Sequence, residues 1–525
     1  MHRSAQLSWL RPLLWALTAL LLWLVGGHLQ VARLHLDYAW DLNFWSEDFF
    51  FTSLLKLRAG SALYGPIADA NSSVYAPGQI WLHYALLAPF GAELSVAAHK
   101  LVEHGIALSA VAVATMLGLE LTRGSPLSGR LRGFVLAPSF ALAVYSNPLV
   151  DGLHPCNLEA LFLAAAAWLS LAMPRLRSAA RGAGLLLLPT LAFLGKQSMG
   201  AVVLVTLAVV AVTTLPRMQR RASLLYLALG ACGGLALIHL LLGRNFWQWG
   251  VVLLGQHAFE WHRVRGLASG VGPWFAPVLV LTVARLGRAL LRRSDDGRVW
   301  LRAGAVVLVF APAALLALFK TRGGSNNTAS LGFALCLVAL PALLDDLARS
   351  TRRWLAAGGV ALWVCQALLW RNHRYVPTAR DYELAAATCD YAATRMRCGE
   401  RVWLGRGASC YARGGRHELL DRMPSVRDIV TAGRQQELGL LQRLDDAEYD
   451  LILLHEADLR FLGPSFWPRL NRHYRLFQTG GEHAEGDYWV HGFQGWGSRR
   501  VLYYERKRDQ GSHRKDAHYG CAGSR

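Results

Sequence analysis

Long apolar segments recur along the first 370 residues of the chain, and short polar stretches separate them. A helix needs about 20 residues to cross the ~30 Å hydrocarbon core of a bilayer. Apolar segments near this length occur eleven times, so the pattern predicts an all-α domain of eleven membrane-spanning helices in residues 1–370. The predicted spans are 9–30, 97–121, 132–149, 158–173, 182–196, 199–215, 222–243, 270–290, 300–319, 328–344 and 354–370.

Two further apolar segments do not fit a crossing helix. Residues 75–91, YAPGQIWLHYALLAPFG, form a short run that contains Pro77 and Pro89. We expect an interfacial or re-entrant helix there, within a first outer loop of residues 31–95. The aromatic residues and short apolar run of residues 244–268 predict a second helix lying in the membrane interface.

Residues 371–525 are charged and contain no apolar run long enough to cross a membrane. The segments 449–454 and 500–507 have the composition of β-strands, and 380–397 and 425–444 have the periodicity of helices. A region of about 150 residues is long enough for one small soluble domain. The pattern therefore predicts a C-terminal α/β domain.

The composition agrees with a membrane protein: 53% of the residues are hydrophobic and 17% are charged, which excludes a disordered chain. The net charge of +20 is typical of nucleic-acid-binding proteins. With a cytoplasmic N-terminus, however, seventeen arginines fall in the inner loops, as the positive-inside rule requires. The charge therefore indicates orientation and no nucleic-acid partner. Eleven spans then place the C-terminal domain on the extracytoplasmic side.

The C-terminal region contains several cysteines, among them Cys389 and Cys398. A disulfide between these two would fit an oxidising compartment outside the cytoplasm. The cysteine spacings do not resemble a zinc site.

The first outer loop contains two adjacent carboxylates, Glu47 and Asp48, within the aromatic sequence NFWSEDFFF. Desolvation at the membrane surface would raise the pKa of a carboxylate and make it a base toward a hydroxyl group. The simpler interpretation is an amphipathic surface helix with both charges in water. Both interpretations stay open at this point.

The second outer loop contains Asp151, His154 and Glu159 within nine residues. Glu159 begins a predicted span, where the helix dipole stabilises a carboxylate whatever its function. A histidine before a proline, such as His154, is often an ordinary loop residue.

The chain has only six lysines, and Lys196 and Lys320 both lie where a predicted span meets the outer face. A lysine at this depth is costly unless it is paired or faces a cavity. The simpler interpretation is that each ammonium group extends to the interface from a helix end. Two lysines at one membrane level favour a bound anion such as a lipid phosphate, and Arg322 close to Lys320 fits that interpretation.

The order of these segments resembles that of the GT-C membrane glycosyltransferases, in particular the lipid A aminoarabinose transferases and the protein O-mannosyltransferases. The resemblance covers residues 37–330, about 55% of the chain. It rests on the acidic pair of the first loop, a short proline-containing helix, an acid after the third span, a lysine after the fifth, a juxtamembrane helix with a histidine, and a later Lys/Gly loop. The matching segments are 46–48, 75–91, 157–168, 195–200, 245–261 and 319–327.

Three positions depart from the family pattern. The acidic pair has the order Glu47-Asp48, whereas the family usually has Asp-Glu, so the equivalent of each residue is open. Glu159 stands where the family usually has aspartate, and the lysine that some members carry before the short helix is missing.

The resemblance implies transfer of a sugar from a polyprenyl-phosphate donor to a glycan, lipid or protein acceptor, with inversion, at the outer face of a bacterial inner membrane. Asp48 by preference, or Glu47, would be the general base. Cations would stabilise the charge that grows on the leaving phosphate. The implied phosphate ligands are Lys196, Lys320, Arg322 and His257, and the implied sugar or acceptor ligands are Glu159, Asp151 and His154.

A divalent metal between Glu47, Asp48 and Glu159 is compatible with their oxygens but is not required by them. Two other functions compete with transfer. A transporter or lipid flippase predicts charged or broken helices near the middle of the membrane in both halves of the chain. A non-catalytic GT-C-like scaffold is compatible with the reversed order of Glu47 and Asp48 and with the missing lysine.

Overall fold

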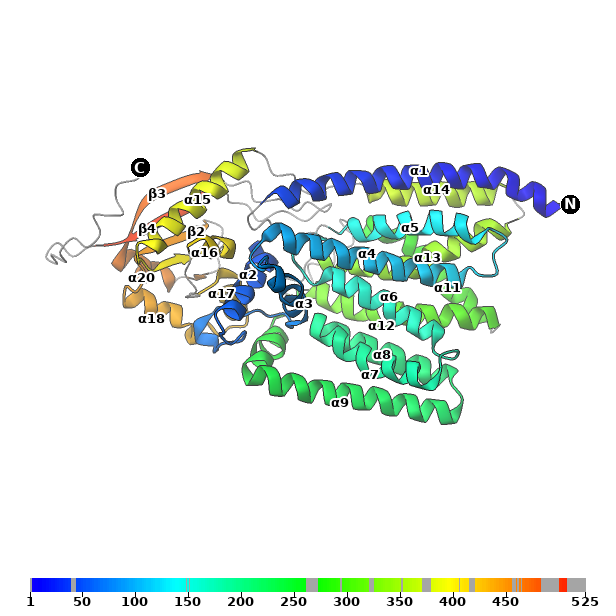
Figure 1. Cartoon of the computed structure of the whole chain (residues 1–525), viewed down its shortest axis with the longest axis horizontal. Helices are drawn as coiled ribbons and strands as arrows, with labels where there is room; N and C mark the ends of the chain where they lie inside the picture. The colour runs from blue at the N-terminus through cyan, green and yellow to red at the C-terminus, as the bar shows by residue number, and fades with distance from the viewer. Residues whose placement is uncertain are drawn as a thin grey trace.

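The computed structural model describes residues 2–38, 44–147, 149–150, 152–260, 272–292, 295–320, 325–350, 353–370, 379–405, 407–414, 421–455, 459, 462–463, 465–482 and 500–507. Long helices lie side by side and form an elongated bundle, with the N-terminus at one end (Figure 1). A small sheet with short helices lies at the other end, and two short helices, α2 and α3, lie between the bundle and the sheet.

Each of the eleven apolar segments predicted to span the membrane forms a helix within the described residues. These helices are α1 (His2–Asp37), α4 (Val96–Leu121), α5 (Gly129–Tyr145), α6 (Cys156–Ala172), α7 (Ser178–Gly195), α8 (Gln197–Thr214), α9 (Arg217–Trp247), α11 (Gly272–Arg292), α12 (Asp295–Phe319), α13 (Ser325–Arg349) and α14 (Arg353–Leu369).

Seven of these helices in the described part of the chain are long and apolar enough to cross a membrane. They are α1, α4, α7, α8, α9, α12 and α13, while α6 and α14 are shorter apolar helices. The chain is therefore an integral, multi-pass membrane protein. The total of eleven crossings stays a prediction, because α5, α6, α11 and α14 do not meet the same length and hydropathy requirement.

Small side chains allow the bundle helices to approach closely. Ala107, Ala110 and Ala114 follow one face of α4, and all three are fully buried. Lipid is as apolar as the helices, so association in a membrane depends on close packing. Substituting larger residues on this face would separate α4 from its neighbours.

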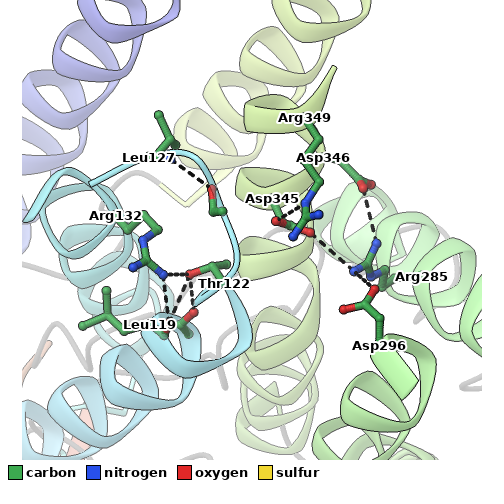
Figure 2. A network of polar contacts seen from close by, with 11 residues as sticks. Leu119, Thr122, Leu127, Arg132, Arg285, Asp296, Asp345, Asp346 and Arg349 are labelled. Atoms are coloured by element: carbon green, nitrogen blue, oxygen red, sulfur yellow. Dashed lines mark hydrogen bonds and ion pairs between the residues drawn. The ribbon is translucent and has the colours of Figure 1, made fainter. Parts of the chain in front are cut away.

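A polar network connects α11, α12 and α13 at the end of the bundle away from the sheet (Figure 2). Arg285 of α11 pairs with Asp296 of α12 at 3.5 Å and with Asp345 and Asp346 of α13 at 3.6 and 3.3 Å. Arg349 pairs with Asp345 at 2.8 Å. Some of the arginines that predicted the orientation therefore also connect helices.

The first outer loop begins with α2 (Phe44–Arg58), continues through a 3₁₀ turn, η1 (Ile67–Asp69), and contains α3 (Gly78–Leu87) and η2 (Ala88–Phe90). The predicted short helix is thus present. Ten residues of α-helix extend only about 15 Å, about half of what a crossing needs. The interpretation that residues 75–91 do not cross agrees with this length.

The helix predicted for residues 244–268 begins as a continuation of α9, after a kink. Gly243 adopts φ +66°, a conformation that only glycine takes without strain, and the chain changes direction there. A π-helical turn, η3 (Gln248–Leu253), follows it.

The C-terminal domain contains a four-stranded sheet of β1 (Val402–Leu404), β2 (Leu451–His455), β3 (Tyr474–Glu482) and β4 (Arg500–Arg506) in the order β1-β2-β4-β3. β1 and β2 are parallel, and the β2–β4 and β4–β3 pairs are antiparallel. The described helices are α15 (Ala379–Arg397), α16 (Ala408–Gly414), α17 (Met423–Thr431), η4 (Gln435–Glu437), α18 (Gly439–Asp445) and α20 (Phe466–His473). The predicted α/β class, the helix 380–397 and both predicted strands are confirmed.

Two predictions for this domain are wrong. Residues 425–444 do not form one helix, because Gly433 adopts φ +74° and separates α17 from η4 and α18. Cys389 pairs with Cys410 and not with Cys398. The fold brings Cys389 of α15 against α16, a tertiary contact that the spacing of cysteines in the sequence does not encode.

Candidate functional site

Helix α2 carries the two candidate bases and is buried on several faces. Residues three, four and seven positions apart share one face of a helix. Asp48 and Leu55 share the face toward the C-terminal domain, where Leu55 packs with its apolar core. Phe50 and Leu54 pack with α3 and α4. By the same spacing, Glu47 belongs to the face of Phe50 and Leu54.

The third face of α2 fixes the loop that follows it. The Lys56 ammonium donates to the Leu63 carbonyl at 3.1 Å, to Asn71 Oδ1 at 2.6 Å and to Ser72 Oγ at 3.2 Å. Burial lowers the pKa of Lys56 to about 8, and the charge of Asp69 offsets part of that effect. A lysine that sequence reasoning left aside therefore shapes the first outer loop.

Asp48 is fully buried and binds the C-terminal domain. Its Oδ2 accepts from Arg422 Nε at 2.9 Å, and its Oδ1 accepts from a second nitrogen of Arg422 and from the Ala408 amide at 3.0 Å. Both side chains of this ion pair are 0% exposed. The carboxylate predicted as the preferred base thus connects residues that lie 374 positions apart in the sequence.

The residue next to Arg422 continues this connection into the domain. Asp421 accepts two hydrogen bonds from Arg443, at 2.6 and 2.8 Å, and one from the Tyr449 hydroxyl at 2.7 Å. Burial raises the pKa of Asp421, and the Arg443 pair opposes that shift. Arg443 also donates to the carbonyl of Ala68 in the first outer loop at 2.9 Å. The C-terminal domain and this loop are therefore joined by buried charged groups.

Lys196 and Glu159 form a buried ion pair at the end of the bundle nearest α2. Their Nζ–Oε2 distance is 2.9 Å, and their side chains are 11% and 1% exposed. The extended backbone of Lys196 separates α7 from α8, and Glu159 lies in the first turn of α6. Ser330 of α13 donates to the same Glu159 oxygen at 2.7 Å. Two predicted site residues from separate segments thus meet directly.

His154 lies beside this pair. Burial, with the nearby charge of Lys196, lowers the pKa of His154 well below its usual range, so its ring is neutral. Its Nε2 lies 3.1 Å from the Tyr75 hydroxyl. Gln197, next to Lys196, donates to the Val74 carbonyl at 2.8 Å. These contacts place the start of the 75–91 segment against the Lys196–Glu159 pair.

The other predicted phosphate ligands lie after α9. Lys320 Nζ donates to the Leu254 carbonyl at 2.9 Å and lies 5.7 Å from the centre of the Phe259 ring. His257 Nε2 lies 3.7 Å from Asp428 Oδ1 of α17. The C-terminal domain thus also contacts this segment. The predicted site residues Asp151 and Arg322 lie outside the described residues.

The described residues contain no group of three or more His, Cys, Asp or Glu side chains that could hold a metal ion. Glu47, Asp48 and Glu159 are therefore not gathered into such a group within this part of the chain. Arg422 pairs with Asp48, and Lys196 pairs with Glu159.

Sequence reasoning missed the contribution of the C-terminal domain. Arg422 and Asp428 are both almost fully buried against the first outer loop and the segment after α9. The signal was present in DRMPSVRDIV (421–430), where an Asp-Arg and an Arg-Asp pair occur within an otherwise apolar stretch. Buried charges in such a stretch need partners, and here those partners come from distant segments.

The bundle, the first outer loop with α2 and α3, and the domain beside them have the architecture of the GT-C membrane glycosyltransferases. ArnT from Cupriavidus metallidurans, solved with undecaprenyl phosphate bound, superposes with a TM-score of 0.52 at 12% identity, covering 93% of this chain and 98% of that one. The Archaeoglobus fulgidus oligosaccharyltransferase superposes with a TM-score of 0.50 at 11% identity, covering 87% and 73%. No family model and no curated protein matches the sequence. At these identities the likeness establishes the fold.

Proposed function

We propose that this protein is a membrane glycosyltransferase that moves a sugar from a polyprenyl-phosphate donor to an acceptor on the extracytoplasmic face, with inversion. One observation carries the proposal: Lys196, singled out in one segment of the sequence, meets Glu159 and His154, singled out in another, at the end of the bundle beside α2. The GT-C fold and the undecaprenyl phosphate bound to ArnT support the class of donor.

Lys196 is the proposed ligand of the donor phosphate. Its ammonium lies 2.9 Å from Glu159 Oε2 at the end of the bundle beside α2. In the proposed step this positive charge stabilises the negative charge that grows on the phosphate as the bond to the sugar breaks. Lys320, His257 and Arg322 are proposed as further phosphate ligands from the segments that follow α9 and α12.

Glu47 is the proposed general base. Asp48, the other candidate, accepts three hydrogen bonds from Arg422 and Ala408, which leave it little basicity. Glu47 lies on another face of α2 and is fully buried. In the proposed step Glu47 takes the proton of an acceptor hydroxyl or amine, the acceptor atom bonds to the anomeric carbon, and the phosphate leaves from the opposite side.

Glu159, His154 and Asp151 are proposed to bind the sugar or the acceptor. The neutral His154 ring can both donate and accept a hydrogen bond, as recognition of a sugar hydroxyl requires. The acceptor is a glycan, a lipid or a protein that enters from the side of the C-terminal domain. We place the protein in a bacterial inner membrane, with a cytoplasmic N-terminus and this domain outside.

The test uses the full-length protein in lipid nanodiscs and a radiolabelled undecaprenyl-phosphate sugar. We expect Glu47→Gln and Lys196→Ala each to lower the rate of sugar transfer at least 100-fold, a loss within the range of a catalytic base or an oxyanion ligand. Glu120→Gln is the matched control, since Glu120 pairs with Arg175 elsewhere in the bundle. Full transfer by both site variants would contradict the proposal.

A non-catalytic scaffold is the second candidate, and the Asp48–Arg422 ion pair favours it because that pair gives one first-loop acid a connecting role. This candidate predicts that the wild-type protein binds undecaprenyl phosphate but releases no sugar to any acceptor. A flippase would instead move the labelled lipid between leaflets without breaking its phosphate–sugar bond.

A further inference from the structure

A buried polar network joins α3, α4 and the first turn of α6. Its members are fully or almost fully buried inside an apolar bundle, where unpaired polar groups are costly. They are Gln79 and His83 of α3, His99 and Glu103 of α4, and Asn157 of α6. The mechanism proposed above uses none of them.

Glu103 lies at the centre of the network. Its Oε1 accepts from Gln79 and lies 2.9 Å from His83 Nε2, and its Oε2 accepts from Asn157 Nδ2 at 2.6 Å. The two histidines face each other with their Nδ1 atoms 3.1 Å apart. His99 Nε2 lies 2.8 Å from the carbonyl oxygen of Glu93.

Two neutral histidines carry one ring N–H hydrogen each, and an ionised Glu103 carries none. The contacts described above need three hydrogens, which is one proton more. His99 Nε2 faces a carbonyl, which only accepts, so Nε2 carries a hydrogen. One of the two facing Nδ1 atoms carries another. The contact between His83 Nε2 and Glu103 needs a third, on either the ring or the carboxyl group. The three side chains therefore share one additional proton and have no net charge.

The network contacts both parts of the candidate site. The ring of Phe50 packs edge-on against His83 and His99, with ring centres 4.9 and 5.0 Å apart, and Phe50 lies one turn beyond Glu47 on α2. Asn157 lies two residues before Glu159 on α6. Phe50 and Asn157 therefore link the network to Glu47 and Glu159. A shift of α3 against α4 would move both of these acids.

Other ionisable groups surround the network on the elements packed against it. Lys100 donates to the carbonyls of His35 and Tyr38, and Glu93 lies 3.7 Å from Arg58. Cys156 lies within electrostatic reach of Glu103, Glu159 and Lys196. The remaining groups are Glu47, Asp48 and Lys56 on α2, Tyr84 on α3 and His104 on α4.

We propose that His83, His99 and Glu103 are positioning residues of the transfer site, and that the proton they share makes the geometry of the site depend on pH. The role in transfer rests on the function proposed above. Removing the proton leaves the Glu103 charge facing the lone pair of His83, which opens the α3–α4 contact. The site is therefore assembled at lower pH and loses its geometry as the pH rises through the point where the proton leaves.

The first measurement is ¹⁵N NMR of the histidine rings in the full-length protein in nanodiscs. At pH 7 we expect either one ring protonated at both nitrogens or, with both rings neutral, a Glu103 carboxyl whose ¹³C shift shows it protonated. We expect this shared-proton signal to be lost in Glu103→Gln and His83→Gln. His104→Gln is the control, because His104 lies on the same helix with its ring stacked on Tyr145. Neutral rings together with an ionised Glu103 carboxyl in the wild type at pH 7, or a ring signal that is unchanged in Glu103→Gln, would overturn the proposal.

The second measurement is amide hydrogen exchange against pH, corrected for the intrinsic rate. Wild-type peptides from α2, α3 and the first turn of α6 should exchange at least tenfold faster above the pH at which the shared-proton signal is lost. In Glu103→Gln this step should disappear. Exchange that shows no step in these peptides of the wild type would show that the proton does not position the site.

Sugar transfer separates this inference from the proposed function. In the wild type, the rate of sugar transfer should fall as the pH rises, with the same midpoint as the step in hydrogen exchange. In Glu103→Gln this fall should disappear. Absence of transfer at every pH, with the expected shared-proton signal and exchange step, contradicts the glycosyltransferase and leaves the shared proton established. A transfer rate in the wild type that does not follow the exchange midpoint contradicts the positioning role.

Discussion

At the scale of single residues, two buried acids of the candidate site, Asp48 and Glu159, have different partners. Arg422 binds Asp48, while Glu159 pairs with Lys196, the proposed ligand of the donor phosphate. Adjacent residues on α2 point about 100° apart, which explains how Glu47 and Asp48 reach different surroundings. We infer that the acidic pair combines a base with a connecting carboxylate.

Lys56 provides a pH-dependent prediction at this scale. Its pKa is about 8 in the fold and 10.5 when unfolded, so the unfolded chain binds more protons between these pH values. The free energy of unfolding should therefore rise with pH in this window, by up to about 3 kcal/mol relative to Lys56→Met. Chemical unfolding at pH 7.5, 9 and 10.5 measures the difference between the two proteins.

Lys507→Met is the control for this experiment, because Lys507 is exposed. The difference in free energy of unfolding between Lys507→Met and the wild type should not depend on pH. A constant difference for Lys56→Met as well would mean that Lys56 keeps its usual pKa in the fold.

The contact between helices α3 and α7 fixes the position of Lys196. Gly78 begins α3, and a Cβ atom there would lie 2.6 Å from the carbonyl oxygen of Leu194, two residues before Lys196. The periodicity of the 75–91 segment predicted a short helix but gave no information about the helix it packs on. Close approach of the two backbones explains why glycine occupies this position.

Gly78→Ala should therefore push α3 from α7 and lower the free energy of unfolding by about 1–3 kcal/mol, the usual cost of overpacking. Sugar transfer should fall as well, because the lysine moves. Gly105→Ala on α4 is the control, since a Cβ there meets nothing within 4 Å. Equal stability of the two variants, measured by thermal unfolding in nanodiscs, would contradict the close contact.

At the scale of the whole molecule, buried charges join the C-terminal domain to the first outer loop. Asp48–Arg422 and Arg443–Ala68 connect segments more than 370 residues apart. His257–Asp428 adds a contact to the segment after α9. The domain therefore forms part of the wall of the candidate site.

Arg422→Ala should lower the free energy of unfolding by about 3–5 kcal/mol, because it leaves a buried carboxylate without its counter-ion. The double variant Asp48→Leu/Arg422→Leu should recover at least half of that loss. Arg475→Ala, which removes an exposed partner of Glu505, should cost less than about 1 kcal/mol. A double-mutant cycle in urea measures the coupling, and additive losses would mean that the ion pair does not join the two parts.

The orientation of the molecule is tested by a reporter. A periplasm-active enzyme fused after residue 380 should be active, and the same enzyme fused after residue 124, in the turn between α4 and α5, should be inactive. The opposite pattern would place the C-terminal domain in the cytoplasm and exclude an extracytoplasmic transfer site.

The sequence by itself determined where the helices of the bundle lie along the chain and that the protein is a membrane protein, because the length of apolar segments follows directly from the thickness of a bilayer. It also singled out Lys196 and Glu159, since charged groups near apolar helix ends are rare. Only the tertiary structure decided which partner each charge takes. The sequence favours Asp48 as the base, and only the structure shows that Arg422, 374 residues away, binds it. Cys389 pairs with Cys410 in place of the nearer Cys398. Such partners depend on the folding of distant segments against one another, which local sequence patterns do not encode.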